Sequence, residues 1–418
     1  ANGGLGLLSR TTARAIARAA REVAAHQLDQ HFVVDAFQAG AGVSFHMNVN
    51  EVIANRAAEL LGGRRGAYDV VHPNDHVNLG QSTNDTFPSA LRIALRMEFD
   101  PLLAAVERAG DAFRAKARQF AGIVKSGRTH LQDAVPLWLS EELGAYGAAL
   151  AACHRELAQA ADELLELGLG GSAAGTGLNA NRRATALALR ELSKHTGHRW
   201  RTAPDLFQAM QSQQPVARAS SAMRNLALEL IRISNDLRLL ASGPMTGLAE
   251  IELPALQPGS SIMPGKVNPV MPEMLAMVSF QVVGNDVAAA LAVQAGQLEL
   301  NVMMPAMALA TLDSATILAN ALDAFTNRCI KGIKANAKRC RAYADATLAL
   351  ATGLNPHIGY TRTAKLVQES LRTGRPLVEL ALEQRLLPAA QLRRILDPER
   401  AAGMKPATRS SRIPNRQA

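Results

Sequence analysis

The sequence has 418 residues, of which 48% are hydrophobic and only 4% aromatic, so a large core must be built from Ala, Leu, Val, Ile and Met. These residues favour helices, and long helices can merge the two or three structural units that this length suggests. The three cysteines, Cys153, Cys329 and Cys340, are scattered and odd in number. This pattern argues against a disulfide framework or a cysteine metal site. It predicts that the protein is located in a reducing cytoplasm.

The net charge of +9 and the pI near 9.8 raise the hypothesis of nucleic-acid binding. The basic residues that cluster are Arg14, Arg18 and Arg21 on one predicted helix face and Lys405, Arg409, Arg412 and Arg416 in the tail. No aromatic residues are interleaved to stack on bases. We interpret them as a solvated face and a basic tail, whose charge could equally help to attract a small anionic ligand.

No uninterrupted apolar run reaches the ~18 to 20 residues of a membrane span. The N-terminus shows no basic start followed by an apolar block and a cleavage site. We therefore expect a soluble protein that is neither secreted nor membrane-bound.

Hydrophobic periodicity predicts helices at residues 11–28 and 50–61, separated by a glycine-rich loop. Five longer helices are predicted at residues 89–120, 137–167, 216–241, 272–300 and 305–339. Beyond residue 347 we expect a small C-terminal region with two shorter helices. Helices of this length indicate a bundle, or an oligomer whose core is made of pooled helices.

Polar loops rich in Gly, Ser, Thr, Asn and His separate the predicted helices, at residues 80–85, 126–133, 168–181 and 243–268. In a helical protein such loops commonly carry binding and chemistry. Residues 259–269 are the most informative, because two glycines and two prolines exclude a regular helix. Ser260, Ser261, Lys266 and Asn268 concentrate donors there, which suits an anionic ligand, although an ordinary surface connection has the same composition.

Two further loops each have a plain structural explanation when taken alone. Ser82, Thr83 and Asn84 precede a long helix, where they are typical caps, but a helix N-terminus with hydroxyls is also a carboxylate site. Thr129 and His130 place a hydroxyl beside an imidazole, although a lone histidine is more often structural. The combination of three such loops favours a functional site.

Several common catalytic and binding motifs are absent or incomplete. No zinc spacing or phosphate loop is present, and the Ser172 segment is no nucleophile elbow because Ala174 stands where that motif needs glycine. Gly168, Gly170 and Ala173 fit a loose dinucleotide pattern, but we expect helices to flank them where that pattern needs a strand.

Residues 259–268 match the Gly-Ser-Ser-x-x-Pro-x-Lys-x-Asn signature of the fumarase/aspartase superfamily without a mismatch. The other two loops fall where that family carries its other conserved segments, and the chain resembles the family from about residue 38 to 388. The resemblance implies an all-α, elongated protomer with a central five-helix bundle. In the family, such bundles pool into a twenty-helix core of a homotetramer, and three subunits form each active site.

The resemblance also implies a division of the chain into three domains. Residues 1–83 form an N-terminal helical domain that is truncated relative to the family, residues 84–340 the long-helix bundle, and residues 341–418 a small C-terminal helical domain with the basic tail. The family chemistry needs no cofactor, although some members respond to divalent metal, and we expect no metal-binding residue in the site.

The family mechanism implies a role for each matching residue. Ser260 is the general base that takes a proton from the carbon beside one substrate carboxylate, and the site stabilises the resulting aci-carboxylate. His130 and Asn84 meet the leaving amino or hydroxyl group, and Glu273 orients His130. Lys266, Asn268 and Thr129 hold one carboxylate, whereas Ser82, Thr83 and Ser261 donate to the carboxylate that gains charge.

The resemblance favours reversible deamination of L-aspartate to fumarate and ammonia. Residues 35–42, 268–273 and 279–286 look like aspartases, whereas residues 76–78 and 85–88 look more like fumarases. The alternatives are a fumarate hydratase, a lyase for a substituted aspartate or another succinyl compound, and a tetrameric paralogue without activity.

Three positions depart from the family pattern. Val43 stands where the family usually has Thr, His46 where it has Asn, and Met245 where it has Arg. Val43 removes a hydroxyl expected to bind a carboxylate, a loss worth about 1.5–3 kcal/mol. With Phe45 and His46 it makes that wall of the site more apolar, which predicts weaker turnover or a changed substrate.

Overall fold

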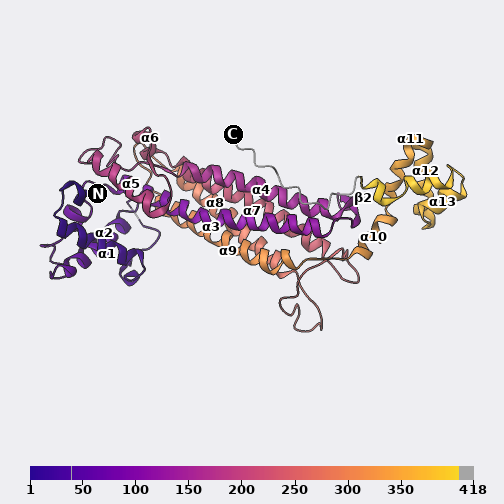
Figure 1. Cartoon of the computed structure of the whole chain (residues 1–418), viewed down its shortest axis with the longest axis horizontal. Coiled ribbons are helices and arrows are strands. Elements are labelled where there is room, and N and C mark those ends of the chain that lie inside the picture. Colours follow the sequence, from indigo (N-terminus) through magenta and orange to yellow (C-terminus); the bar gives the residue numbers. More distant parts are fainter. Residues whose placement is uncertain (39, 404–418) are drawn as a thin grey trace. The chain divides into compact units, whose positions relative to one another are not determined.

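The computed structural model describes residues 1–38 and 40–403 (Figure 1). The chain forms two compact units: unit 1 contains residues 1–104, 153–228 and 278–320, and unit 2 contains residues 105–152, 229–277 and those from 321 onward. The unit boundaries fall inside long helices. The predicted division at residues 83 and 340 stays a prediction, and Lys405, Arg409, Arg412 and Arg416 of the basic tail lie outside the described residues.

The fold is predominantly helical, which confirms the predicted class. The helices before the C-terminal region are α1 Arg10–Ala24, α2 Val43–Leu60, α3 Thr83–Gln119, α4 Leu139–Glu163, α5 Arg182–Thr196, α6 Leu206–Gln211, α7 Gln214–Leu240, α8 Val270–Gln294 and α9 Met304–Arg328. The C-terminal region holds α10 Ala337–Ala346, α11 Asn355–Ile358, α12 Tyr360–Thr373, α13 Leu377–Glu383, α14 Ala389–Ile395 and α15 Pro398–Ala401. It therefore has more helices than the two predicted.

Three small two-stranded sheets interrupt the helices. The strands are β1 Val124–Thr129, β2 Gln132–Trp138, β3 Glu166–Leu167, β4 Arg201–Thr202, β5 Ile251–Glu252 and β6 Lys334–Ala335. β1 pairs antiparallel with β2, β3 parallel with β4, and β5 antiparallel with β6. The prediction of a loop at residues 126–133 is therefore wrong, because these residues belong to a β-hairpin.

The five long predicted helices are all present, with boundaries that capping and turn residues move by several positions. α3 begins at Thr83 rather than residue 89, because Asp85 accepts from the Ser82 backbone N–H at 3.1 Å while the Ser82 hydroxyl accepts from the Asn84 N–H at 3.2 Å. α2 begins at Val43, where a left-handed turn ends at Gly42. α5 and α6 were not predicted.

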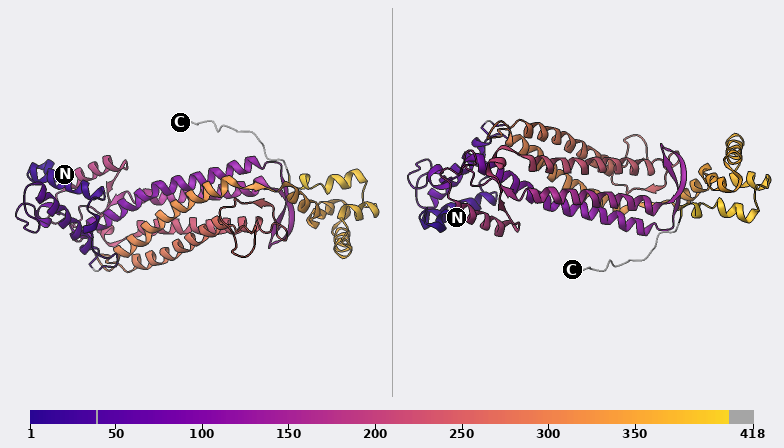
Figure 2. Two further views of the ribbon diagram at one scale, coloured as in Figure 1. Left: turned by 90° about the horizontal axis from the view of Figure 1, so that it is seen from below. Right: turned by 90° about the horizontal axis from the view of Figure 1, so that it is seen from above.

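In unit 1, segments of α3, α4, α7, α8 and α9 lie side by side (Figure 2). Polar contacts join neighbouring helices: Ser220 to Asp286, Asn285 to Ser314, Thr316 to Glu98, and Asn225 to Glu156. α1 and α2 pack through buried alanines such as Ala19, Ala54 and Ala57. Small side chains let these two helix backbones approach closely.

In unit 2, the other segments of the same helices pack around aromatic rings. The Phe113 ring of α3 lies 5.5 Å from the Tyr146 ring of α4 and 6.4 Å from the Phe325 ring of α9. The Tyr146 hydroxyl bonds to Asp236 of α7 at 3.1 Å. The C-terminal helices have a separate leucine core that includes Leu354 and Leu380.

Two stretches are long and apolar enough to cross a membrane by length and composition alone, Val270–Gln294 (α8) and Met304–Gly332. The sequence contains no uninterrupted apolar run of this length, as expected. The two helical stretches qualify only because the criterion allows one or two charged residues, such as Asp286. Asp286 bonds to Ser220 and pairs with Arg224 at 3.2 Å, so this charged residue of α8 is bound to α7. Only 28% of the apolar part of α8 is buried.

Candidate functional site

The first group of predicted site residues, Ser82, Thr83 and Asn84, lies at the start of α3 in unit 1. The Ser82 hydroxyl accepts from the Asn84 backbone, so its own hydrogen stays available to a ligand. The Asn84 side-chain NH₂ donates to the Ala173 carbonyl at 2.9 Å. This bond leaves the amide oxygen of Asn84 free to accept from an ammonium or hydroxyl group.

Asp85 holds this helix start to the 168–177 loop. One of its carboxylate oxygens accepts from the backbone N–H groups of Gly170 at 2.9 Å and Ser172 at 3.0 Å. Burial raises the pKa of Asp85, and the N–H groups of Ser172, Gly170 and Ser82 oppose that rise. Sequence reasoning did not assign Asp85 a role, although the Ser82-x-x-Asp85 spacing is a readable capping signal.

The prediction that helices flank the loose dinucleotide pattern at Gly168, Gly170 and Ala173 is wrong. A two-residue strand, β3, does precede Gly168, so helices do not flank the loop on both sides. α5 begins only at Arg182, which is too far along the chain for the phosphate to meet its N-terminus as that motif requires. This segment therefore does not fit the dinucleotide motif, because no helix begins directly after its glycines.

α2 contributes a residue to the Ser82–Asn84 group. The His46 Nδ1 lies 2.8 Å from the Thr83 Oγ1, and the imidazole is buried with 8% exposure. Burial lowers the pKa of His46. Val43 lies one helical turn before His46 and is 42% exposed. One of the three departures from the family pattern, His46, therefore contacts a predicted substrate-binding hydroxyl, and a second, Val43, lies one turn away on the same helix.

The second group, Thr129 and His130, lies at the tip of the β1–β2 hairpin in unit 2. Thr129 pairs with Gln132, so His130 and Leu131 form a two-residue turn. Both have left-handed backbones, with φ of 53° and 60°. Such a turn normally takes Asn or Gly, so this His-Leu pair is strained, and it exposes the imidazole to solvent.

A buried ion network supports this hairpin. Glu250 is fully buried and lies 3.0 Å from both the Lys125 ammonium and the Arg128 guanidinium. Lys125 also pairs with Glu142 at 2.8 Å, and Arg128 lies over the Tyr343 ring at 5.3 Å. These contacts fix the strand that ends at Thr129. Sequence reasoning missed the network, since Arg128 and Glu250 are 122 residues apart.

The third group lies in the 259–268 loop of unit 2, which closes on itself. The Gly259 N–H donates to the Lys266 carbonyl at 2.8 Å, and the Asn268 NH₂ donates to the Gly259 carbonyl at 2.8 Å. A side chain at Gly259 would meet the Lys266 carbonyl oxygen at 2.5 Å, so only glycine fits there. Ser260 and Lys266 both line a cavity of about 510 Å³ in this loop.

The Ser260 oxygen accepts two backbone N–H groups, from Ile262 at 3.2 Å and Met263 at 3.1 Å. Donors aimed at an oxygen stabilise negative charge on it, so this arrangement favours a serine alkoxide. Lys266 is exposed and has no ion-pair partner among the described residues. Asn268 keeps one amide hydrogen for a ligand, because its NH₂ group has two.

Glu273 lies in the first turn of α8. Over residues 1–38 and 40–403, no hydrogen bond or ion pair joins it to His130. The predicted orientation of His130 by Glu273 therefore is not made within one copy of the chain and stays a prediction for assembled copies.

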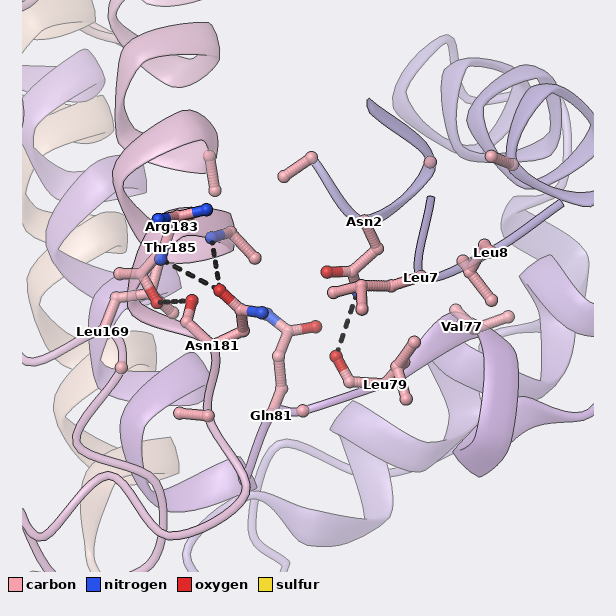
Figure 3. A pocket seen from close by; sticks show the side chains of 18 of the residues that line it. Asn2, Leu7, Leu8, Val77, Leu79, Gln81, Leu169, Asn181, Arg183 and Thr185 are labelled. Carbon is pink, nitrogen blue, oxygen red and sulfur yellow. Dashed lines mark hydrogen bonds between the residues drawn. The ribbon is translucent and has the colours of Figure 1, made fainter. Parts of the chain in front are cut away.

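Unit 1 also contains a cavity of about 970 Å³ between the N-terminal segment, the 76–81 segment and the start of α5 (Figure 3). Asn2 donates to the Leu79 carbonyl at 3.1 Å, and Asn181 caps α5 through the Arg183 N–H at 3.0 Å (Figure 3). Gln81 and Asp85 line this cavity, whereas Ser82, Thr83 and Asn84 do not. It is therefore distinct from the predicted carboxylate site.

In the described part of the chain, no cluster of three or more His, Cys, Asp or Glu side chains is arranged to hold a metal ion. The expectation that the chemistry needs no cofactor or metal stays a prediction.

Comparison with known proteins identifies the family. The pattern of a family described as "Lyase" matches residues 2–284, and that of "Fumarase C C-terminus" matches residues 350–402. An aspartate ammonia-lyase of Bacillus sp is 45% identical over 95% of this chain and 85% of that protein. A class II fumarate hydratase of Chromobacterium violaceum is 44% identical over 96% of this chain and 87% of that protein.

A solved structure agrees with these sequence relatives. The fumarate lyase:delta crystallin from Brucella melitensis, crystallised with cobalt, is 44% identical and superposes with a TM-score of 0.92, covering 96% of this chain and 87% of that chain. Both the sequence and the fold therefore match over nearly the whole chain. The chain belongs to the fumarase/aspartase superfamily of lyases.

Proposed function

We propose that this chain is a carbon–nitrogen lyase that reversibly deaminates L-aspartate to fumarate and ammonia. The 259–268 loop carries the proposal, because it presents Ser260 with two N–H donors and an unpaired Lys266 around one cavity. The 45% identity to an aspartate ammonia-lyase supports it.

The first step is removal of a proton from the substrate carbon next to one carboxylate. The Ser260 alkoxide takes this proton, and the electron pair moves into the carboxylate, which becomes a doubly charged aci-carboxylate. The N–H groups of Ile262 and Met263 lower the cost of the alkoxide before the step. Hydroxyls of Ser82, Thr83 and Ser261 would donate to the carboxylate that gains charge.

In the second step the aci-carboxylate collapses, the carbon–carbon double bond forms, and the carbon–nitrogen bond breaks. The free amide oxygen of Asn84 suits an ammonium group, which can only donate. His130, exposed at the hairpin tip, is the second group proposed to meet the leaving amine. Lys266, Asn268 and Thr129 would hold the other carboxylate throughout.

We also propose that the site is completed by assembly into a homotetramer. Met277, Phe280, Val287 and Leu291 form one stripe on α8 and are each 56–62% exposed. Their spacing of three, seven and four residues places them on a single helix face. A second copy of this chain is the occupant that we infer, since a soluble enzyme does not leave such a stripe in water.

A reducing cytoplasm is the proposed location, and none of the three cysteines, all of which the structure describes, forms a disulfide. The proposed partners are a small dicarboxylate and further copies of the chain, without membrane or nucleic acid.

Fumarate hydration is the second candidate, favoured by the 44% identity to a fumarate hydratase. Purified protein offered L-aspartate and, separately, L-malate distinguishes the two through the ultraviolet absorbance of fumarate. We expect fumarate from aspartate alone. Fumarate from malate alone would make the chain a hydratase, and fumarate from neither would contradict both functions.

The same assay tests Ser260 as the base. Ser260→Ala should lower kcat by about 100- to 10,000-fold, because a general base contributes that much. Ser261→Ala, in the same loop, should lose less, about 10- to 100-fold, as expected for one hydrogen bond to a charged group. Equal effects of the two substitutions would contradict the assignment.

A further inference from the structure

The His46 side chain makes one hydrogen bond among the described residues, and it goes to a predicted substrate-binding group. Its Nδ1 lies 2.8 Å from the Thr83 Oγ1, across the contact between α2 and α3 in unit 1. Asn would stand here in the family pattern, so this imidazole is a feature of this chain. Either the Nδ1–H of His46 or the Thr83 hydroxyl could donate in this hydrogen bond.

Packing holds the start of α2, which carries His46, against the start of α3. A side chain on Gly42 would meet the Phe87 ring at 2.5 Å, so glycine lets the start of α2 approach that ring closely. The Phe45 ring contacts Phe87 edge to face at 6.2 Å, on the same two elements. The backbone at His46 is therefore held close to the helix start that carries Thr83.

Counting protons decides the direction of the hydrogen bond. Burial lowers the pKa of His46, so the imidazole is neutral at pH 7 and carries one N–H. The Thr83 hydroxyl has a single hydrogen, and a carboxylate can only accept. If Nδ1 accepted from Thr83, no hydrogen would remain on Thr83 for the substrate. If Nδ1–H donates, the hydroxyl hydrogen points outward to the carboxylate.

We propose that His46 is a positioning residue that donates its Nδ1–H to Thr83, thereby directing the Thr83 hydroxyl hydrogen at the substrate carboxylate that gains charge. The inference rests on the function proposed above and extends it to a residue outside the family pattern. Val43, one turn earlier, supplies no donor, so the site depends more heavily on Thr83.

A double-mutant cycle tests this role. His46→Leu keeps the bulk of the ring but removes its nitrogens, and Thr83→Val removes the hydroxyl. His46→Leu should lower kcat for L-aspartate by about tenfold with a smaller change in KM, because the bond matters most in the transition state. In the Thr83→Val background, the same substitution should cost less than about twofold.

Two further variants separate positioning from folding. His46→Asn keeps an N–H donor and should retain most of the kcat that His46→Leu loses. His195→Leu removes an exposed histidine of α5 in the same unit and should leave kcat unchanged. Equal losses from His46→Leu in the two backgrounds, or a His46→Asn protein as slow as His46→Leu, would overturn the proposal.

Binding of succinate gives a readout that does not depend on turnover. If the wild-type protein produces fumarate from neither substrate, the proposed function fails, and calorimetric titration with succinate measures the same cycle through Kd. A loss of affinity from His46→Leu that disappears in the Thr83→Val background supports the positioning role. The same loss in both backgrounds contradicts it.

Discussion

At the scale of single residues, the candidate site departs from ordinary local preferences where chemistry is proposed. His130 has a left-handed backbone that costs a non-glycine residue about 1 kcal/mol or more, and it stands exposed rather than packed. Ser260 directs its oxygen at two backbone N–H groups, where it can hold negative charge. These features are typical of functional residues rather than of structural ones.

Substitution of Val43 tests whether a hydroxyl at this position would bind a substrate carboxylate. Val43→Thr adds a hydroxyl on the face of α2 that carries His46, one turn away. A new hydrogen bond to a carboxylate is worth about 1.5–3 kcal/mol, so kcat/KM for L-aspartate should rise roughly 10- to 100-fold. Steady-state kinetics with fumarate detection measure the change.

Val43→Ala is the matched control, since it changes the side chain without adding a donor. No gain from Val43→Thr over this control would indicate that the exposed valine contacts an apolar part of a different substrate. In that case, substituted aspartates would be the compounds to test next.

At the scale of elements, the β1–β2 hairpin depends on a charge network that lies below it. Glu250 compensates Lys125 and Arg128, and its backbone carbonyl accepts from the Asn336 N–H at 2.9 Å. One residue thus ties the hairpin to the α9–α10 connection. The buried charges are costly unless each keeps its partner.

Glu250→Gln should destabilise the protein by about 3–5 kcal/mol, because it leaves two buried cations without their shared carboxylate. Glu252→Gln is the control: Glu252 lies two residues further along and forms an exposed pair with Lys334 at 3.3 Å, which is worth at most about 1 kcal/mol. Thermal unfolding at matched protein concentration compares the two. Equal shifts in Tm would show that the network contributes no more than a surface pair.

At the scale of the whole molecule, the exposed stripe on α8 is the feature that supports the proposed assembly of several copies. Such an assembly would also explain why the described residues show no bond between Glu273 and His130, if separate copies bring them together. The apolar character of α8 then reflects a protein core shared among subunits rather than a membrane.

Phe280→Lys should disrupt the assembly, because a charge would enter that apolar contact. Light scattering after size exclusion should give four times the 44.5 kDa chain mass for the wild-type protein and a smaller mass for the variant. Leu371→Lys, on an exposed leucine of α12 outside the stripe, should not change the mass. A wild-type monomer, or a Phe280→Lys tetramer, would contradict the proposed interface.

The sequence by itself determined the features that depend on local interactions. Apolar periodicity predicted all five long helices, and the capping residues and the Gly-Ser-Ser loop were readable because their partners lie within ten residues. The hairpin is also local, since Thr129 pairs with Gln132, but its polar composition was interpreted as a loop. Only the tertiary structure decided the His46–Thr83 contact and the Arg128–Glu250 pair, which join residues 37 and 122 positions apart. Such contacts depend on how helices pack against one another, which local composition does not specify.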